Sequence, residues 1–159
     1  MTALLSPDLE VIGICSVNGN RDIEHTTENT LRVVEYLGSK VPVYKGCALP
    51  LVATLPEWRK PTVPIRGQAN PEHNVHDDYV PLPPATIKPQ KQNAVSWLVD
   101  TLMASDGDIT LIPVGPLTNV AAAIRIQPEI VGKIQEIIYM GGGYKVNNIT
   151  PGAEFNVWV

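Results

Sequence analysis

Residues 9–38 read LEVIGICSVNGNRDIEHTTENTLRVVEYLG, and this stretch decides the fold class. Its first nine residues form a nearly continuous apolar run of strand length, which is typical of a parallel strand buried on both faces. From residue 22 to residue 37 the apolar side chains recur at helical spacing, and Gly38 follows as a stop signal. A buried strand followed directly by such a helix predicts a strand–helix–strand unit.

The same alternation runs through the rest of the chain. Strand–helix repetition predicts an α/β fold with a mostly parallel open sheet, flanking helices and right-handed crossovers. We interpret residues 1–159 as a single, incomplete domain in which residues 48–90, with nine of the fifteen prolines, form one long loop. Further strands are expected at 41–44, 109–112, 135–140 and 153–159, and further helices at 91–103 and 116–124.

The composition limits the class of protein. The chain has 159 residues, a formal net charge of -4 and two cysteines. The acidic balance argues against a nucleic-acid partner, which a basic stripe would indicate. Two cysteines are too few for a disulfide framework, so we expect a reducing, cytoplasmic compartment. Since no stretch approaches about 18 apolar residues, no membrane partner is expected.

Polar or proline-rich turns follow two of the strands, where an open parallel sheet binds its ligands. Asn18, Gly19 and Asn20 are either a turn that caps the next helix or a polar pair that faces a ligand. Pro113 and Pro116 have no N–H to donate, which leaves carbonyls without backbone partners at the end of a later strand. Such carbonyls suit a hard cation such as Ca²⁺, and an ordinary helix-start turn explains the same pattern.

Three further segments carry candidate site residues. The glycine run 141–143 lacks the spacing of a phosphate-binding loop, so it indicates a close backbone approach to a ligand or tight packing. In the strand expected at 153–159, Glu154 and Asn156 point to one face, where they suit sugar hydroxyls or belong to an exposed edge. Residues 72–78, EHNVHDD, fit either a zinc site or a solvated polar loop.

Four segments together resemble one known family. They are the stretch quoted above, VPVYKG, DGDITLIPVGPLTNVAAAI and IIYMGGGYKVNNITPGAEFNVWV. In order and spacing they resemble the nucleoside hydrolases of the inosine-uridine-preferring type, including the pyrimidine-preferring members, over almost the whole chain except about 50–90. The resemblance implies an open α/β fold, a homo-oligomer, and hydrolysis of the N-glycosidic bond of purine or pyrimidine ribonucleosides by water held on Ca²⁺.

The resemblance also implies roles for individual residues. Val114 matches the residue whose main-chain carbonyl is a calcium ligand. His76 matches a histidine of the mobile loop near the nucleobase, although the family's VHG-type continuation reads VHDDYV here. The residues implied in substrate binding are Asn20, His76, Met140, Asn148, Glu154 and Asn156. Of these, Asn20, Met140, Glu154 and Asn156 are expected to share one concave site with Val114.

The family pattern includes carboxylates that these residues lack. Nucleoside hydrolases open with a DxDxxxDD cluster just before the segment that corresponds to residues 4–7, and they carry further aspartates after the EFN motif. These groups hold the metal, and one of them activates the water. We therefore expect the general base upstream of Met1, no catalytic residue within 1–159, and an incomplete calcium ligand set. The alternative is a non-catalytic remnant that binds ribose or a partner, whereas a dinucleotide-binding oxidoreductase lacks its glycine fingerprint here.

Overall fold

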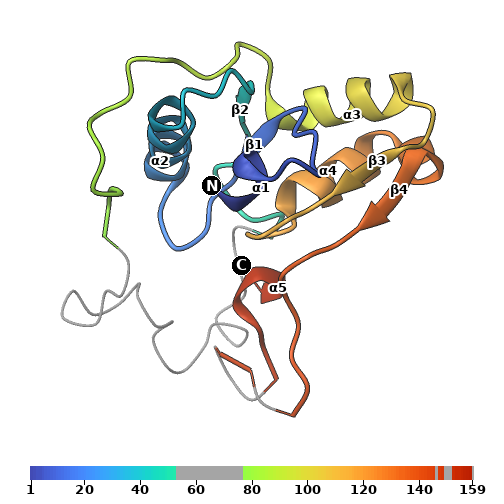
Figure 1. The fold of residues 1–159 in the computed structure, drawn as a ribbon. Coiled ribbons are helices and arrows are strands. Elements are labelled where there is room, and N and C mark those ends of the chain that lie inside the picture. Colours follow the sequence, from blue (N-terminus) through green and yellow to red (C-terminus); the bar gives the residue numbers. More distant parts are fainter. Residues whose placement is uncertain (53–76, 146, 149–151, 159) are drawn as a thin grey trace.

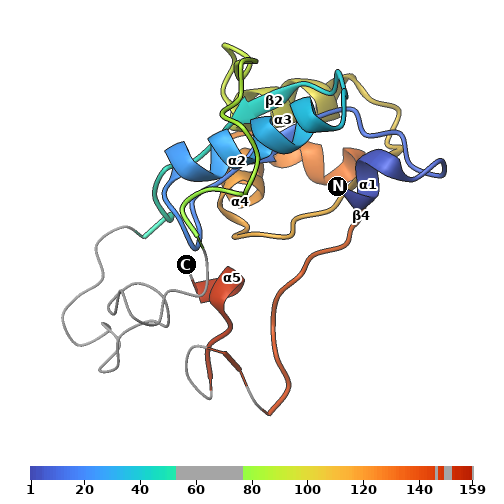
Figure 2. The same cartoon turned by 60° about the vertical axis from the view of Figure 1, so that its left-hand side comes forward.

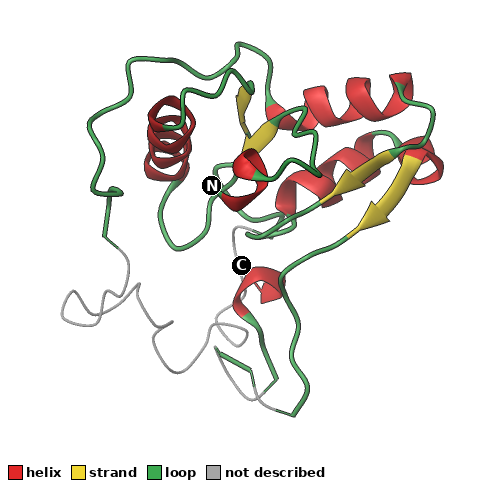
Figure 3. Ribbon diagram, in the orientation of Figure 1, coloured by secondary structure: helices red, strands yellow, loops and turns green. Residues whose placement is uncertain are grey.

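The computed structural model describes residues 1–52, 77–145, 147–148 and 152–158. Helices and strands alternate along this length, and the strands form two parallel pairs, β1 with β2 and β3 with β4 (Figures 1 and 3). The elements in chain order are α1 (Thr2–Leu5), β1 (Ile14–Ser16), α2 (Ile23–Tyr36), β2 (Val43–Lys45), α3 (Ala94–Ala104), β3 (Ile109–Leu111), α4 (Thr118–Ile126), the 3₁₀-helix η3 (Pro128–Lys133), β4 (Ile134–Ile137) and α5 (Phe155–Trp158).

The first strand–helix–strand unit is β1, α2 and β2. The strands pair in parallel register, with Ile14 opposite Val43. Helix α2 begins after Asp22, whose carboxylate accepts a hydrogen bond of 3.0 Å from the N–H of His25, and it ends before Gly38 at a positive φ of 63°. Leu31 and Val34 of α2 pack on Val43 of β2 to form the first core cluster. The apolar side chains that recur at helical spacing therefore form the face of α2 that packs on the strands.

The second unit is β3, α4, η3 and β4. Its strands also pair in parallel, with Ile109 opposite Ile134 and one irregularity after Ile109. Helix α3 packs against α4, and the second core cluster is built where they meet. Its buried members are Val95, Leu98, Leu102, Ala123 and Ile130. Cys15 of β1 packs against this cluster, and burial raises the pKa of its thiol to about 12, so it is a core residue and no nucleophile at neutral pH.

One buried side chain joins the two units. Asn119, near the start of α4, is 5% exposed. Its Nδ2 donates to the carbonyl of Ser16 at 2.9 Å, and its Oδ1 accepts from the N–H of Cys47 at 2.8 Å. The close approach requires glycine at position 46, because a Cβ there would lie 2.3 Å from Asn119 Oδ1 and 2.5 Å from the Ser16 carbonyl. A single amide therefore ties the ends of β1 and β2 to the second unit.

The α/β fold class and its parallel strands are confirmed, but the strand expected at 153–159 is wrong. After a one-residue bridge at Ala153 the chain turns into α5. Local polar groups stabilise that helical turn: the carbonyl of Glu154 accepts from Trp158 N–H at 2.9 Å, and the Glu154 carboxylate accepts from Val157 N–H at 3.2 Å. The other strands are shorter than predicted, because an apolar run continues beyond the residues that actually pair.

The proline-rich loop is described only in part. Residues 53–76 lie outside the described residues, whereas residues 77–90 run along α2 without forming a helix or strand of their own (Figure 2). Among the described helices, none is both long and apolar enough to cross a membrane. The described part of the loop forms one wall of a cavity at the carboxyl ends of the strands.

Candidate functional site

A cavity of about 520 Å³ lies where the strands end. The turn after β1, the segment after β3, the residue Met140 after β4, and α5 supply one side of it, and residues 77–81 supply another. Its described lining includes Asn18, Asn20, Asn29, Val114, Met140 and Asn156. This is the edge at which an open parallel α/β sheet binds ligands, because the carboxyl ends of the strands meet there.

The turn after β1 presents two asparagines with different surroundings. Asn20 is exposed at the cavity, whereas Asn18 is 8% exposed and its backbone N–H donates to the carbonyl of Cys47 at 3.0 Å. Within the described part of the chain, Asn18 Oδ1 has no hydrogen-bond partner. Neither asparagine caps α2, because Asp22 does so. The reading of this turn as a helix cap is therefore wrong.

The segment after β3 places the Val114 carbonyl at the cavity. Pairing with the β4 side continues as far as Pro113, whose carbonyl accepts from Met140 N–H at 2.9 Å. Next along the chain, the Val114 carbonyl accepts from the side-chain amide of Asn156 at 3.4 Å. A side chain thus takes the place of a backbone partner where the two prolines predicted the ladder to end.

Asn156, in α5, holds the ends of both strands. It is 6% exposed, and its Nδ2 donates to the carbonyl of Met140 at 2.8 Å as well as to Val114. Both hydrogens of the amide are thereby engaged. Asn156 consequently fixes the relative positions of two residues that the family resemblance implies in the site.

Glu154 and Asn148 form a separate cluster beside the cavity lining. The Glu154 carboxylate accepts from Gly142 N–H at 3.1 Å and lies 3.5 Å from Nδ2 of Asn148. Asn148 Oδ1 in turn accepts from Phe155 N–H at 2.8 Å. The expectation that Glu154 and Asn156 share a face is wrong, because residues two apart diverge at the start of a helix instead of alternating as in a strand. Of the two interpretations of the glycine run, tight packing agrees with the Gly142 contact, and Gly142 has a positive φ of 77°.

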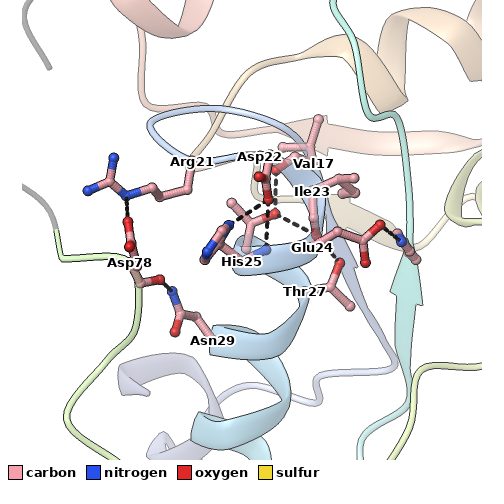
Figure 4. A network of polar contacts seen from close by, with 11 residues as sticks. Val17, Arg21, Asp22, Ile23, Glu24, His25, Thr27, Asn29 and Asp78 are labelled. Carbon is pink, nitrogen blue, oxygen red and sulfur yellow. Dashed lines mark hydrogen bonds and ion pairs between the residues drawn. The ribbon is translucent and has the colours of Figure 1, made fainter. Parts of the chain in front are cut away.

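The opposite wall, residues 77–81, is held by α2 and by Arg21, two residues before that helix (Figure 4). Arg21 pairs with Asp78 at 3.0 Å, and the side chain of Asn29 binds the backbone of Asp78 and Val80 at 2.9 Å each. The sequence analysis missed Asn29. The signal was present, since Asn29 belongs to a polar stripe of α2 that includes Arg32, but nothing in the sequence says what such a stripe contacts.

The next residues of this segment are held by carboxylates. Glu28 accepts from the N–H of Ala85 at 3.0 Å, and Glu35 accepts from the N–H of Thr86 at 2.8 Å. The hydrogen bond from Ala85 holds the pKa of Glu28 below its usual value, and the hydrogen bonds from Thr86 do the same for the pKa of Glu35. A lowered pKa means that the contact is complete above the ordinary glutamate pKa and is lost as pH falls through the folded-state value.

We therefore expect acid to loosen this part of the segment first. As the pH falls from neutral to below the ordinary glutamate pKa and through the lower folded-state value, the amides of Ala85 and Thr86 should lose protection from hydrogen exchange, after correction for the intrinsic exchange rate. The Val80 amide is the internal control, because its acceptor is the side-chain amide of Asn29, which does not titrate. Equal loss at all three amides would contradict the assignment to the two glutamates.

Comparison with known proteins identifies the family. The family model described as inosine-uridine preferring nucleoside hydrolase matches residues 1–159. The chain belongs to this family. The family resemblance predicted from the four sequence segments is thereby confirmed.

Individual nucleoside hydrolases agree with the assignment. The pyrimidine-specific ribonucleoside hydrolase RihB of Escherichia coli O9:H4 (strain HS) is 42% identical over 160 residues, covering 99% of this chain and 47% of the relative. The purine-preferring ribonucleoside hydrolase from Gardnerella vaginalis superposes with a TM-score of 0.77 at 31% identity, over 95% of this chain and 46% of that one. The plant nucleoside hydrolase PpNRh1 gives a TM-score of 0.78 at 32% identity, over 97% and 46%. The chain spans about half the length of the curated relatives it matches.

Not all substrate residues expected for a nucleoside hydrolase come together here. Among those that the structure describes, Asn20, Val114, Met140 and Asn156 line one cavity, whereas Glu154 and Asn148 lie in the adjoining cluster. His76 and residues 72–75 of the EHNVHDD segment lie outside the described residues. Whether any of these residues binds substrate stays a prediction.

The described residues do not fit a calcium site by themselves. Calcium takes several oxygen ligands and draws much of its affinity from carboxylates. The cavity offers the neutral oxygens of the Val114 carbonyl, Asn20 and the unpartnered Asn18 Oδ1, and within its described lining Asp77 is the one carboxylate. No group of three or more histidine, cysteine, aspartate or glutamate side chains that could hold a metal occurs among the described residues.

Proposed function

We propose that this protein hydrolyses the N-glycosidic bond of purine or pyrimidine ribonucleosides to free base and ribose, and that the described residues supply its ribose-binding side. Membership of the nucleoside hydrolase family supports the reaction. The observation that carries the proposal is the convergence of Asn20, Val114, Met140 and Asn156 on one cavity at the carboxyl ends of parallel strands. As the resemblance implies, we expect the enzyme to be homo-oligomeric, and its two free cysteines favour a reducing, cytoplasmic compartment.

The chemistry of the four residues suits a sugar. The exposed amide of Asn20 can both donate to and accept from neighbouring hydroxyls, and the Val114 carbonyl adds an acceptor close by. Met140 is 56% exposed and offers an apolar surface to the carbon face of the ring. Asn156 holds the Val114 and Met140 carbonyls in place through its two N–H groups. Carbonyls held in this way need less ordering at the moment of binding.

We also propose the Val114 carbonyl as one oxygen ligand of Ca²⁺. A complete ligand set would need carboxylates that the described residues do not bring to the cavity. That same observation favours the alternative, a ribose-binding module without catalysis. Both readings require the ribose side to bind, and turnover distinguishes them.

Binding can be tested by titrating the isotopically labelled chain with D-ribose and with uridine while following its amide resonances. We expect shifts at the amides of Asn20 and Met140, and we expect Asn20→Ala to weaken binding about tenfold, the loss of roughly 1.4 kcal/mol of hydrogen bonding. Gln127→Ala is the control. Gln127 follows the last residue of α4, outside the described cavity lining, and its side-chain amide donates to the carboxylate of Glu129 at 2.9 Å. Binding that is equal in both variants, or absent from the unchanged chain, would refute the ribose site.

A further inference from the structure

We propose that Asn29 of α2 is a positioning residue that fixes the register of residues 77–81, the second wall of the cavity, and thereby sets how a ligand fits between the two walls. The consequence for the ligand rests on the proposed function, whereas the placement of the wall does not.

The wall needs partners from outside itself. Residues 77–90 form no helix or strand, so their backbone N–H and C=O groups cannot pair with one another in a regular ladder. The stripe of α2 side chains supplies the partners in order along the segment: Asn29 for Asp78 and Val80, Arg32 for Leu82 at 3.0 Å, and then the two glutamates. The helix itself is anchored independently, by its buried leucine and valine in the first core cluster.

Asn29 makes two hydrogen bonds to backbone groups of the wall. Its Nδ2 donates to the carbonyl of Asp78 and its Oδ1 accepts from the N–H of Val80, both at 2.9 Å. The chain bends at Asp78 and Tyr79, and the amide of Asn29 spans this bend. A slip by one residue would place Pro81 where Val80 now donates, and proline has no N–H to donate. One amide therefore specifies a single register.

Charged and aromatic groups hold the flanking side chains in that register. Arg21 pairs with the Asp78 carboxylate at 3.0 Å. The guanidinium of Arg32 lies 4.4 Å from the centre of the Tyr79 ring, and the His25 ring lies 4.9 Å from the same ring (Figure 4 shows Arg21, Asp78, His25 and Asn29). Tyr79 is thereby kept beside α2. The two bonds of Asn29 act on the backbone of the wall, and Arg32 adds a longer one of 3.5 Å to the carbonyl of Val80.

The register matters because the wall and the ribose side face the same cavity. Tyr79, Val80 and Pro81 line it together with Asn29 itself, and Asn20 and Val114 belong to the ribose side. The wall has no other described secondary structure to hold it, so its distance from the ribose side depends on the α2 contacts. Moving a wall of a binding site away from its partner groups costs affinity even when no ligand contact is removed directly.

The test compares Asn29→Ala, Asn29→Asp and Tyr36→Ala in the full chain. Asn29→Ala removes both bonds, whereas Asn29→Asp keeps an acceptor for Val80 N–H and loses the donor to the Asp78 carbonyl. Tyr36, at the end of α2, is 64% exposed and serves as the control. We expect hydrogen exchange at the Val80 amide to accelerate at least about tenfold in Asn29→Ala and much less in Asn29→Asp, with an unchanged urea midpoint in all three.

The outcomes separate this inference from the proposed function. Uridine affinity should fall about tenfold in Asn29→Ala, fall less in Asn29→Asp and stay unchanged in Tyr36→Ala, a loss without global unfolding that a merely structural role would not produce. Unchanged Val80 exchange in Asn29→Ala overturns the inference, and so does a released wall with unchanged affinity. If the unchanged chain binds neither ribose nor uridine, the proposed function fails, and Val80 exchange alone still decides whether Asn29 places the wall.

Discussion

The 159-residue chain should hydrolyse uridine, cytidine and inosine at least about 10²-fold more slowly than a version that also carries an upstream DxDxxxDD segment. General-base assistance contributes roughly 10²–10⁴-fold to such reactions, and it requires a carboxylate placed at the attacking water. Of the carboxylates in the described part of the chain, Asp77 lines the cavity on the wall away from the ribose side, and Glu154 is engaged with the N–H groups of Gly142 and Val157. The measurement is release of free base in excess Ca²⁺, with both proteins at equal concentration.

Asp77→Asn provides the control for this prediction. If the chain shows turnover that the variant loses, Asp77 acts as the base and the site assignment changes. Comparable turnover by the shorter and the longer protein would show that the catalytic carboxylates lie within residues 1–159. Either result would favour an enzyme over a ribose-binding module.

Replacing Asn119 by alanine should lower the free energy of unfolding by roughly 2–4 kcal/mol. The substitution leaves the Ser16 carbonyl and the Cys47 N–H without their partner, and a buried polar group without a hydrogen bond costs about 1–3 kcal/mol. Asn119→Asp should cost at least as much at neutral pH. It keeps the acceptor for the Cys47 N–H, but it places a charged oxygen against the Ser16 carbonyl. Urea unfolding measures both, with Gln127→Ala as a surface control.

Gly46→Ala tests the same junction from the other side. Its Cβ would meet the Asn119 side chain and the Ser16 carbonyl, so it should also destabilise, by about 1–3 kcal/mol. The double variant Gly46→Ala, Asn119→Ala should lose less than the sum, because one of the two clashes is gone. Additive losses would show that the two positions do not interact, and a loss below about 1 kcal/mol in Asn119→Ala would show that the junction contributes little.

The sequence predicts those parts of the fold whose signal is local and long. The helix predicted at 22–37 has its apolar face, its capping aspartate and its terminal glycine all within one stretch, and the structure agrees within a residue or two at each end. The run at 9–17 predicts a buried parallel strand, yet only Ile14–Ser16 pair. Leu9 and Ile12 of this run are exposed, so its apolar character indicates neither burial nor pairing along the whole run, and pairing depends on where the neighbouring strand begins and ends.

The candidate site is harder to predict because its contacts join distant segments. Residues 153–159 have an apolar alternation that fits a strand, but the N–H groups of Phe155 and Val157 donate to the side chains of Asn148 and Glu154 and so stabilise a helical turn there instead. Asn29 meets a segment about 50 residues away, and neither partner carries a motif. Resemblance to the family predicts roles for Asn20 and Val114, which stay predictions, and it predicts none for a side chain such as Asn29, whose contacts depend on the local packing of one wall.

The hydrogen bonds of Asn119 also bear on the order in which the parts of the chain fold and on its unfolding rate. Within each unit the paired strand residues are close in sequence: Ile14 pairs with Val43 and Ile109 with Ile134. The Asn119–Ser16 bond instead spans 103 residues, and closing so long a loop is entropically costly before other contacts exist. The two units should therefore form early and join after the rate-limiting barrier. Asn119→Ala would then leave the refolding rate almost unchanged and speed unfolding by nearly the whole of its effect, a φ-value close to zero.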